Sequence, residues 1–523
     1  MTGDIPRQGV FNLWYEPWLP VRHVDGRRGL VSLSGALITA STIADIDSPN
    51  PLANAVALRF LVALYMRTQG APLEDGSVAA WVEWSKGRLD SGVDAKKVAS
   101  YGNSYQDRFW LLGGDAPFLQ DPAIATECDK RSGTNKLVMA RASGNNPLFW
   151  TKVPDSQSPP LSHADAALEL LAQWGYGAGG TCASRRKVSK GVAGLLRPLT
   201  IFILRGQSLA ETLALNAIAD PSLVEDSNRD ACVWEQAPGA SPGLGVLSQL
   251  TASPQGLLLF GDAAGVTDAV LTWGAKVDPA LISRDQYAAF WKPSKKAESS
   301  QAPYKVRADN MAWKELPAIL GAPSTGARPM LFVRPPFVLS FASHPLRSHE
   351  SCLLERAAVT CTSHLTGQAK DVLSTVSTFP SLLSLSPGAN YQRSLMLARA
   401  TEAMEQAVES LKQACLEVAG EPLKVAETLE HLASHGPLSK KDQAAGLVTT
   451  ALAMAWKLGE DAFQSVVATK TTTAAADYLK EVGTLFDRYC QSATLEPRRA
   501  IIVASARQKL QRSLRDIAKE KQL

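Results

Sequence analysis

The sequence predicts an α+β protein: a large mixed α/β domain over residues 1–385, followed by a four-helix bundle over residues 388–523. In the first part, short β-type runs alternate with helical stretches and with many Gly and Pro breaks. After Ser386-Pro387-Gly388, the chain becomes rich in Ala, Leu, Glu, Lys and Gln, with apolar residues three and four positions apart. A length of 523 residues also favours more than one hydrophobic core.

Several elements of the first domain can be predicted directly. Apolar β-type runs predict strands over 30–33, 199–204 and 256–260. Pro51 to Arg67 carries apolar residues at helical spacing, which predicts a buried helix. The long polar segments 141–160 and 292–307 predict loops, and loops of this length in a compact domain commonly bind a partner.

The second domain is predicted to consist of long amphipathic helices with short connections, the pattern of an up-and-down bundle. Their expected ranges are 391–419, 441–469, 472–491 and 497–520. The last helix carries many Arg and Lys residues outside its apolar stripe. These residues could guide a nucleic-acid strand, face a neighbouring subunit or form an ordinary solvated face, and the sequence leaves these alternatives open.

Composition limits the possible classes of function. The chain is 45% hydrophobic and 20% charged, which is typical of a globular protein. No apolar run approaches the roughly 20 residues that cross a bilayer, and no leader pattern opens the chain, so we expect a cytoplasmic protein without a membrane partner. Seven scattered cysteines without a CxxC pair indicate a reducing compartment. The net charge is only +4, so any contact with nucleic acid must come from local basic clusters.

No catalytic or metal-binding constellation is convincing. His431 and His435 have the i, i+4 spacing of a metal site, but the Glu of an HExxH motif is missing. The polar stretch 348–352 comes from one short segment, whereas the members of a catalytic triad normally come from separate segments. We therefore predict a protein that is not an enzyme and uses no cofactor or metal.

A glycine-rich segment, 175–180, is followed by a basic run. Glycines let a backbone approach a ligand, and the Lys and Arg residues would neutralise phosphates. A plain turn beside a solvated face is the alternative. An enzyme that binds a nucleotide phosphate through Gly175–Gly180 is another, although the segment follows a predicted helix instead of a strand. The candidate residues are Gly177, Gly179, Gly180, Arg185, Arg186 and Lys187.

A second candidate is the loop over 142–152, which combines amides with adjacent aromatic residues. Amide side chains can hydrogen-bond to base edges, and an aromatic side chain can stack on a base. Aromatic residues that anchor a loop to the core are the alternative. The candidate residues are Asn145, Asn146, Phe149, Trp150 and Thr151.

The order of motifs along the whole chain resembles the CasA family, the large subunit of type I-E CRISPR surveillance complexes (Cascade). The resemblance includes the aromatic and glycine loops and the helical end of the chain. Its other motifs are Phe11 to Val21 leading to Leu30–Leu33, Asp107–Leu111, Pro117–Gln120, Gly206–Asn216 and Trp234–Glu235.

The resemblance implies a non-catalytic subunit that recognises the protospacer-adjacent motif, a short sequence that flanks the target in double-stranded DNA. By this resemblance, Phe149 and the glycine loop approach the motif, with the family's Asn replaced by Thr151 or its role taken by Asn145 or Asn146. Lys276 matches a lysine that enters the minor groove.

The resemblance further implies that a polar wedge, here Gln368 and Lys370, separates the strands. The implied partners are other Cascade subunits, CRISPR RNA and a recruited helicase-nuclease. A purely structural scaffold subunit remains the alternative.

Overall fold

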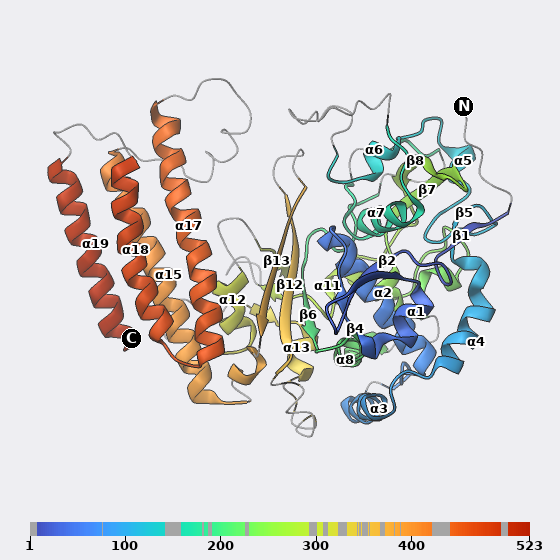
Figure 1. Ribbon diagram of the computed structural model, residues 1–523, viewed down its shortest axis with the longest axis horizontal. Helices are drawn as coiled ribbons and strands as arrows, with labels where there is room; N and C mark the ends of the chain where they lie inside the picture. The colour runs from blue at the N-terminus through green and yellow to red at the C-terminus, as the bar shows by residue number, and fades with distance from the viewer. Residues whose placement is uncertain are drawn as a thin grey trace. The chain divides into compact units, whose positions relative to one another are not determined.

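The computed structural model confirms the predicted α+β class (Figure 1). The residues it describes are 8–75, 77–141, 158–179, 183–186, 191–224, 230–291, 301–306, 312–322, 332–342, 344, 347, 354, 356–366, 372–380, 382–386, 389–420, 440–492 and 500–523. The chain divides into two compact units, one made of 1–305 with 336–378 and the other of 306–335 with 379–523.

The core of the first unit is built around helix α2 (Pro51–Gln69). The Asn50 side chain accepts hydrogen bonds from the backbone N–H groups of Leu52 and Ala53, and Gly70 ends the helix at φ 70°. Nearly all its side chains are buried, as predicted, including Arg59, whose Nη2 lies 2.8 Å from Asp285 Oδ2. Helices α7 (His163–Tyr176), α8 (Leu209–Asn216) and α10 (Val246–Thr251) pack against it.

Four groups of paired strands belong to this unit. Strands β3 (Arg28–Val31), β2 (Leu19–His23) and β4 (Ile43–Ile46) form one sheet in that order. Strands β13 (Val372–Pro380), β12 (Ala358–Thr366) and β6 (Thr200–Arg205) form another. Strands β7 (Gln255–Asp262) and β8 (Gly265–Trp273) form a hairpin, and β1 (Val10–Asn12) pairs with β5 (Trp110–Leu112).

The remaining elements of this unit are shorter or lie at its periphery. They are α1 (Leu33–Ile38), α3 (Val78–Ser91), α4 (Ala95–Tyr105), α5 (Ile124–Glu127), α6 (Thr134–Leu137), α9 (Pro221–Val224), α11 (Ala280–Ser283), β9 (Phe290–Trp291), β10 (Ala302–Pro303) and α13 (Phe337–Ala342).

The second unit contains the four predicted helices. They are α15 (Tyr391–Ala419), α17 (Lys440–Thr469), α18 (Thr473–Ser492) and α19 (Ala500–Lys521), and they lie side by side in Figure 1. Each boundary lies within three residues of its expected position, because the breaks in the apolar periodicity are local signals.

The structure differs from the sequence analysis in two places. Residues 306–335 were expected in the first domain but belong to the unit of the bundle, together with strand β11 (Phe332–Arg334). Helix α12 (Ala312–Ile319) packs there because Trp313 fits against Gly459, where a Cβ atom would lie 2.6 Å from the indole. The predicted strand over 30–33 ends at Val31, because the Ser32 side chain accepts a hydrogen bond from Gly35 N and starts helix α1.

Candidate nucleic-acid interface

The edge of β8 that β7 leaves free holds the ends of the segments selected from the sequence. Leu161 and Val266 exchange two backbone hydrogen bonds of 2.9 Å. Ser132 N donates to Ala269 O at 2.7 Å, and Ala183 N donates to Leu271 O at 2.9 Å. The chain on both sides of the aromatic loop and the chain after the glycine loop are therefore anchored along one strand.

The glycines of 175–179 lie against the protein's own backbone. Gly194 N donates to Gly177 O at 2.9 Å. A Cβ atom on Gly177 would lie 2.5 Å from Gln173 O, and one on Gly179 would lie 2.6 Å from Ala193 N. Gly177 is buried and Gly179 is half-buried. Close internal packing therefore explains why both positions are glycine.

The position of these glycines argues against a nucleotide-binding loop. They follow the C-terminus of α7, whose last carbonyls form the negative end of the helix dipole. Phosphate groups bind instead at helix N-termini, where free N–H groups and the positive end of the dipole meet the anion.

Arg185, expected to contact DNA, is instead neutralised inside the protein. Its Nη2 lies 2.5 Å from Asp121 Oδ2, its Nε lies 2.5 Å from Glu127 Oε2, and its Nη1 donates to Trp273 O at 3.2 Å. Only 8% of the residue is exposed. This pairing could not be predicted from the sequence, because Asp121 and Glu127 lie about 60 residues away along the chain.

Arg186 has a different environment. Its Nη2 lies 2.6 Å from Asp129 Oδ1, but both side chains are largely exposed. An exposed ion pair contributes little stability and can exchange for a phosphate group. Arg186 therefore keeps an exposed charge, with a second, longer hydrogen bond of 3.3 Å from its Nη2 to Thr126 O.

Lys276 lies close to the glycine segment. It is exposed and follows β8, where Trp273 Nε1 donates to Gly179 O at 3.4 Å. The Trp273 indole also packs against Gly191. The structure thus brings Gly179 to the end of β8, three residues before Lys276, and Arg185, the neighbour of Arg186, bonds to Trp273 O at the same end.

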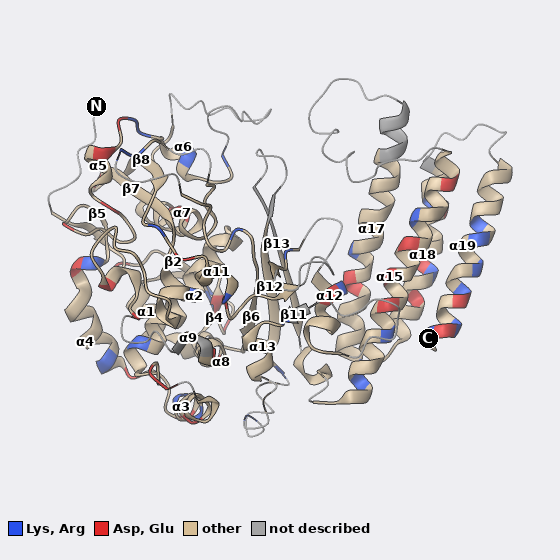
Figure 2. Cartoon of the chain, turned by 180° about the vertical axis from the view of Figure 1, so that it is seen from behind, with Lys and Arg blue, Asp and Glu red and all other residues tan. Residues whose placement is uncertain are grey.

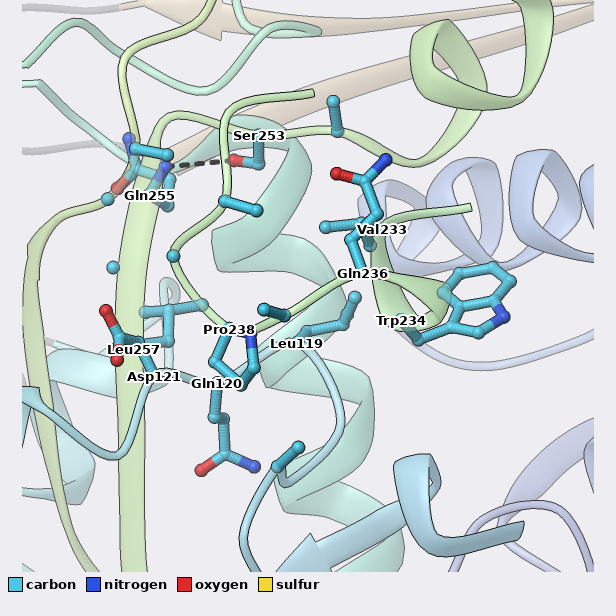
Figure 3. A pocket seen from close by; sticks show the side chains of 18 of the residues that line it. Leu119, Gln120, Asp121, Val233, Trp234, Gln236, Pro238, Ser253, Gln255 and Leu257 are labelled. Carbon is cyan, nitrogen blue, oxygen red and sulfur yellow. Dashed lines mark hydrogen bonds between the residues drawn. The ribbon is translucent and has the colours of Figure 1, made fainter. Parts of the chain in front are cut away.

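A cavity of about 60 Å³ lies beside this segment (Figure 3). Figure 3 shows Gln255, Ser253, Pro238 and Asp121 around it, and the backbone N–H of Gln255 donates to Ser253 Oγ at 3.1 Å. Gly274 and Ala275, which precede Lys276, also line it. Its volume is enough for a few water molecules.

Three of the six basic residues of α19 are paired within the bundle. Arg507, Lys509 and Lys521 lie 2.7, 2.8 and 3.1 Å from carboxylates on neighbouring helices. These carboxylates belong to Asp487, Glu417 and Glu402. Figure 2 shows charges of both signs along these helices. This pairing favours a structural role for the three residues over a role in guiding a nucleic-acid strand.

Several predicted site residues, and the two catalytic or metal candidates, lie outside the described residues. They are Asn145, Asn146, Phe149, Trp150, Thr151, Gly180, Lys187, Gln368 and Lys370, together with 348–352, His431 and His435. Within the described part of the chain, no group of three or more His, Cys, Asp or Glu residues could hold a metal ion. Among the same residues, no helix is long and apolar enough to span a bilayer.

Comparison with known proteins gives matches over nearly the whole chain. The sequence model of the family described as CRISPR-associated protein Cse1 matches residues 12–520. A protein of Thermus thermophilus, described as CRISPR-associated protein CasA/Cse1, is 36% identical over 228 residues. That alignment covers 44% of this chain and 42% of the Thermus protein, so it spans less than half the length of each.

Solved structures with the same fold are similar along their full length. A chain of a CRISPR RNA-guided surveillance complex has a TM-score of 0.75 at 24% identity, with 96% of this chain and 100% of that chain covered. Thermobifida fusca Cse1 also has a TM-score of 0.75, at 20% identity, with 97% and 98% covered. Acidimicrobium ferrooxidans Cse1 has a TM-score of 0.70 at 22% identity, with 98% and 99% covered.

Proposed function

Because the chain belongs to the family of CRISPR-associated protein Cse1, we propose that it is a non-catalytic, DNA-binding subunit of a Cascade surveillance complex. Its partners are the other subunits of the complex, CRISPR RNA and double-stranded target DNA, in the cytoplasm. On target binding it recruits the helicase-nuclease that cuts the DNA. The protein itself needs no cofactor for this task.

The observation that carries the proposal is the grouping of segments around the end of β8. Exposed Lys276 and the half-buried Gly179 share this region, and Arg185, next to exposed Arg186, bonds to Trp273 O there. The chain on both sides of the aromatic loop attaches to the same strand, at Ala269 and at Val266. Exposed Lys and Arg side chains can neutralise the phosphates of a DNA duplex, and these contacts position the protein on the duplex.

Recognition in this proposal is limited to a short flanking motif. Lys276 contacts the minor groove, and the aromatic loop with Phe149 and Trp150 contacts the duplex next to it. The minor groove distinguishes few base pairs, so several motifs are tolerated. Guide-RNA pairing reads the remaining sequence, by analogy with Cas9-type proteins.

Strand separation then starts beside the motif. Exchange of a DNA duplex for an RNA–DNA heteroduplex is nearly balanced in energy, so a few favourable contacts decide whether it begins. Gln368 and Lys370, which follow β12 in the chain, are the proposed wedge. Arg185 has no part in DNA contact in this proposal, since its charge is already neutralised.

The test compares two lysine variants in a titration of the full chain and its assembled complex with labelled duplex DNA. We expect Lys276→Ala to weaken binding by about tenfold and to reduce discrimination between flanking motifs. Lys86→Ala is the matched control, because Lys86 is exposed on α3, at the opposite end of this unit from β8 in Figures 1 and 2.

Two results would contradict the proposal in different ways. Equal affinity of both variants and the unaltered chain would remove Lys276 from the interface. A complex that assembles with its RNA-binding partners but has no affinity for DNA would favour the purely structural scaffold.

A further inference from the structure

Three segments that each carry a basic residue adjoin the start of strand β6. Thr200, its first residue, lies opposite Ser363 of β12, next to His364. Thr200 N also donates to Tyr304 O at 3.0 Å, and Lys305 follows Tyr304. Arg197 lies just before β6, where its Nη1 donates to Tyr176 O at 2.8 Å.

His364 is buried, and among the described residues neither Nδ1 nor Nε2 has a hydrogen-bond partner. Only 1% of the residue is exposed. Its ring stacks on Tyr176, with centroids 6.2 Å apart and an interplanar angle of 20°. A buried imidazole normally bonds through at least one nitrogen, so this side chain is in the state expected of a site that awaits a ligand.

No acidic residue balances this cluster within the described part of the chain. Arg197 and Lys305 are both half-buried, and none of the ion pairs between described residues includes either of them. Two other basic residues that are buried in this unit, Arg59 and Arg185, each have a carboxylate within hydrogen-bonding distance. No ion pair between described residues gives Arg197 or Lys305 such a carboxylate.

Burial lowers the pKa of all three groups, and repulsion between like charges lowers two of them further. Burial and the charge of Arg197 lower the pKa of Lys305 to about 8. Burial, followed by the charges of Arg197 and Lys305, lowers the pKa of His364 to about 4. Burial alone lowers the pKa of Arg197. An anion bound among them would relieve this repulsion and restore the charged forms.

We propose that Arg197, Lys305 and His364 bind one phosphate group of a nucleic-acid backbone. A guanidinium and an ammonium group are the common ligands of phosphate, and a protonated imidazole would add a further charged donor. This assignment rests on the proposed function, because β12 leads from His364 directly to the proposed wedge with Gln368 and Lys370. A phosphate held there would fix the strand as it is parted.

The first test measures DNA affinity of Lys305→Met in the full chain, with Lys86→Met as the matched control. We expect Lys305→Met to weaken duplex binding by about tenfold and to reduce the slope of log K against log salt by about one. His364→Gln keeps a polar side chain but cannot take up a proton. It should weaken binding more at pH 6 than at pH 8, because only the native imidazole gains a charge as the anion binds.

The second test uses thermal melting with inorganic phosphate as the probe, which distinguishes ligand binding from a structural role. Without phosphate, Lys305→Met should melt at a higher temperature than the unaltered chain, since one of the repelling charges is gone. Phosphate should raise the melting temperature of the unaltered chain and leave that of Lys305→Met unchanged.

The outcomes separate this inference from the proposed function. If Lys276→Ala weakens DNA binding but Lys305→Met does not, the phosphate site is wrong and the proposed function stands. If phosphate stabilises the unaltered chain but Lys305→Met binds DNA as tightly as the unaltered chain does, the site binds a free anion. The assignment to nucleic acid is then wrong. If the unaltered chain has no DNA affinity, both proposals fail.

Discussion

Arg185 and Arg186 are neighbours in the sequence but have opposite surroundings. The first bridges Asp121 and Glu127 in the interior, and the second pairs with exposed Asp129. A charged side chain can bind a ligand only if the fold leaves it exposed to solvent. Two adjacent arginines can therefore differ completely in their availability to a ligand.

We predict that Arg185→Met lowers the stability of the first unit by about 3–5 kcal/mol, because two buried carboxylates lose their partner. Arg186→Met should change it by less than about 1 kcal/mol, since an exposed pair contributes little. Hydrogen exchange of the β7 and β8 amides reports on this unit by itself. An Arg185→Met variant of unchanged stability that has lost DNA affinity would show that Arg185 contacts DNA after all.

His364 predicts a pH dependence of stability. Burial, Arg197 and Lys305 lower its pKa from 6.5 to about 4 in the folded chain. Between these values the unfolded chain binds the proton and the folded chain does not, so stability falls as pH decreases from about 6.5 to about 4. In His364→Gln this fall should be smaller, as measured by melting temperature across the range. Identical pH profiles for the two proteins would show that His364 is not held neutral.

At the scale of elements, the glycine segment after α7 acts by packing. Gly177 and Gly179 approach Gln173, Gln255 and Ala193 closely, so this backbone segment lies flat against 191–196 and reaches Trp273. The segment therefore ends against Trp273, three residues before Lys276, whereas the sequence left a ligand-binding loop and a plain turn equally open.

We predict that Gly177→Ala destabilises the first unit by about 1–3 kcal/mol, because the new Cβ would overlap Gln173 O and Gln255 Oε1. Gly87→Ala is a matched control on α3, where nothing lies within 4 Å of the new atom. There the change should stabilise the helix by about 0.5–1 kcal/mol. Urea denaturation, monitored by hydrogen exchange of the β7 and β8 amides, measures the free energy of unfolding of both glycine variants. Equal effects would mean that the segment can shift to accept a side chain.

For the whole molecule, the modest net charge of +4 makes local clusters decisive. Among the described residues, Lys276 is exposed and Lys305 and Arg197 have no ion pair, while Arg507 and Lys509 of α19 pair with carboxylates of the bundle. DNA binding should therefore depend on a few phosphate contacts.

We predict that log K for duplex DNA falls linearly with log salt, with a slope of about −0.9 for each phosphate neutralised. Lys276→Ala and Arg186→Met should each make the slope shallower by up to about one. Fluorescence anisotropy over a range of salt concentrations measures this. A flat profile would exclude a phosphate-based interface, and a thermal shift with ATP or NAD would instead support the nucleotide-binding alternative.

The sequence by itself determined the features that depend on neighbours along the chain. The buried helix over 51–67 and the four helices of the bundle follow from apolar periodicity and from Gly and Pro breaks, which are local signals. The family resemblance rests on ordered motifs, which are also readable without a structure, and the family match over 12–520 confirms it.

Only the tertiary structure decided which basic residues remain available and which segments belong together. Arg185 is neutralised by acids from 121–127, His364 meets Arg197 and Lys305, and α12 joins the bundle through Trp313. The physical reason is that Coulomb interaction, burial and close packing depend on distance in space, and residues far apart in the chain become neighbours only when it folds.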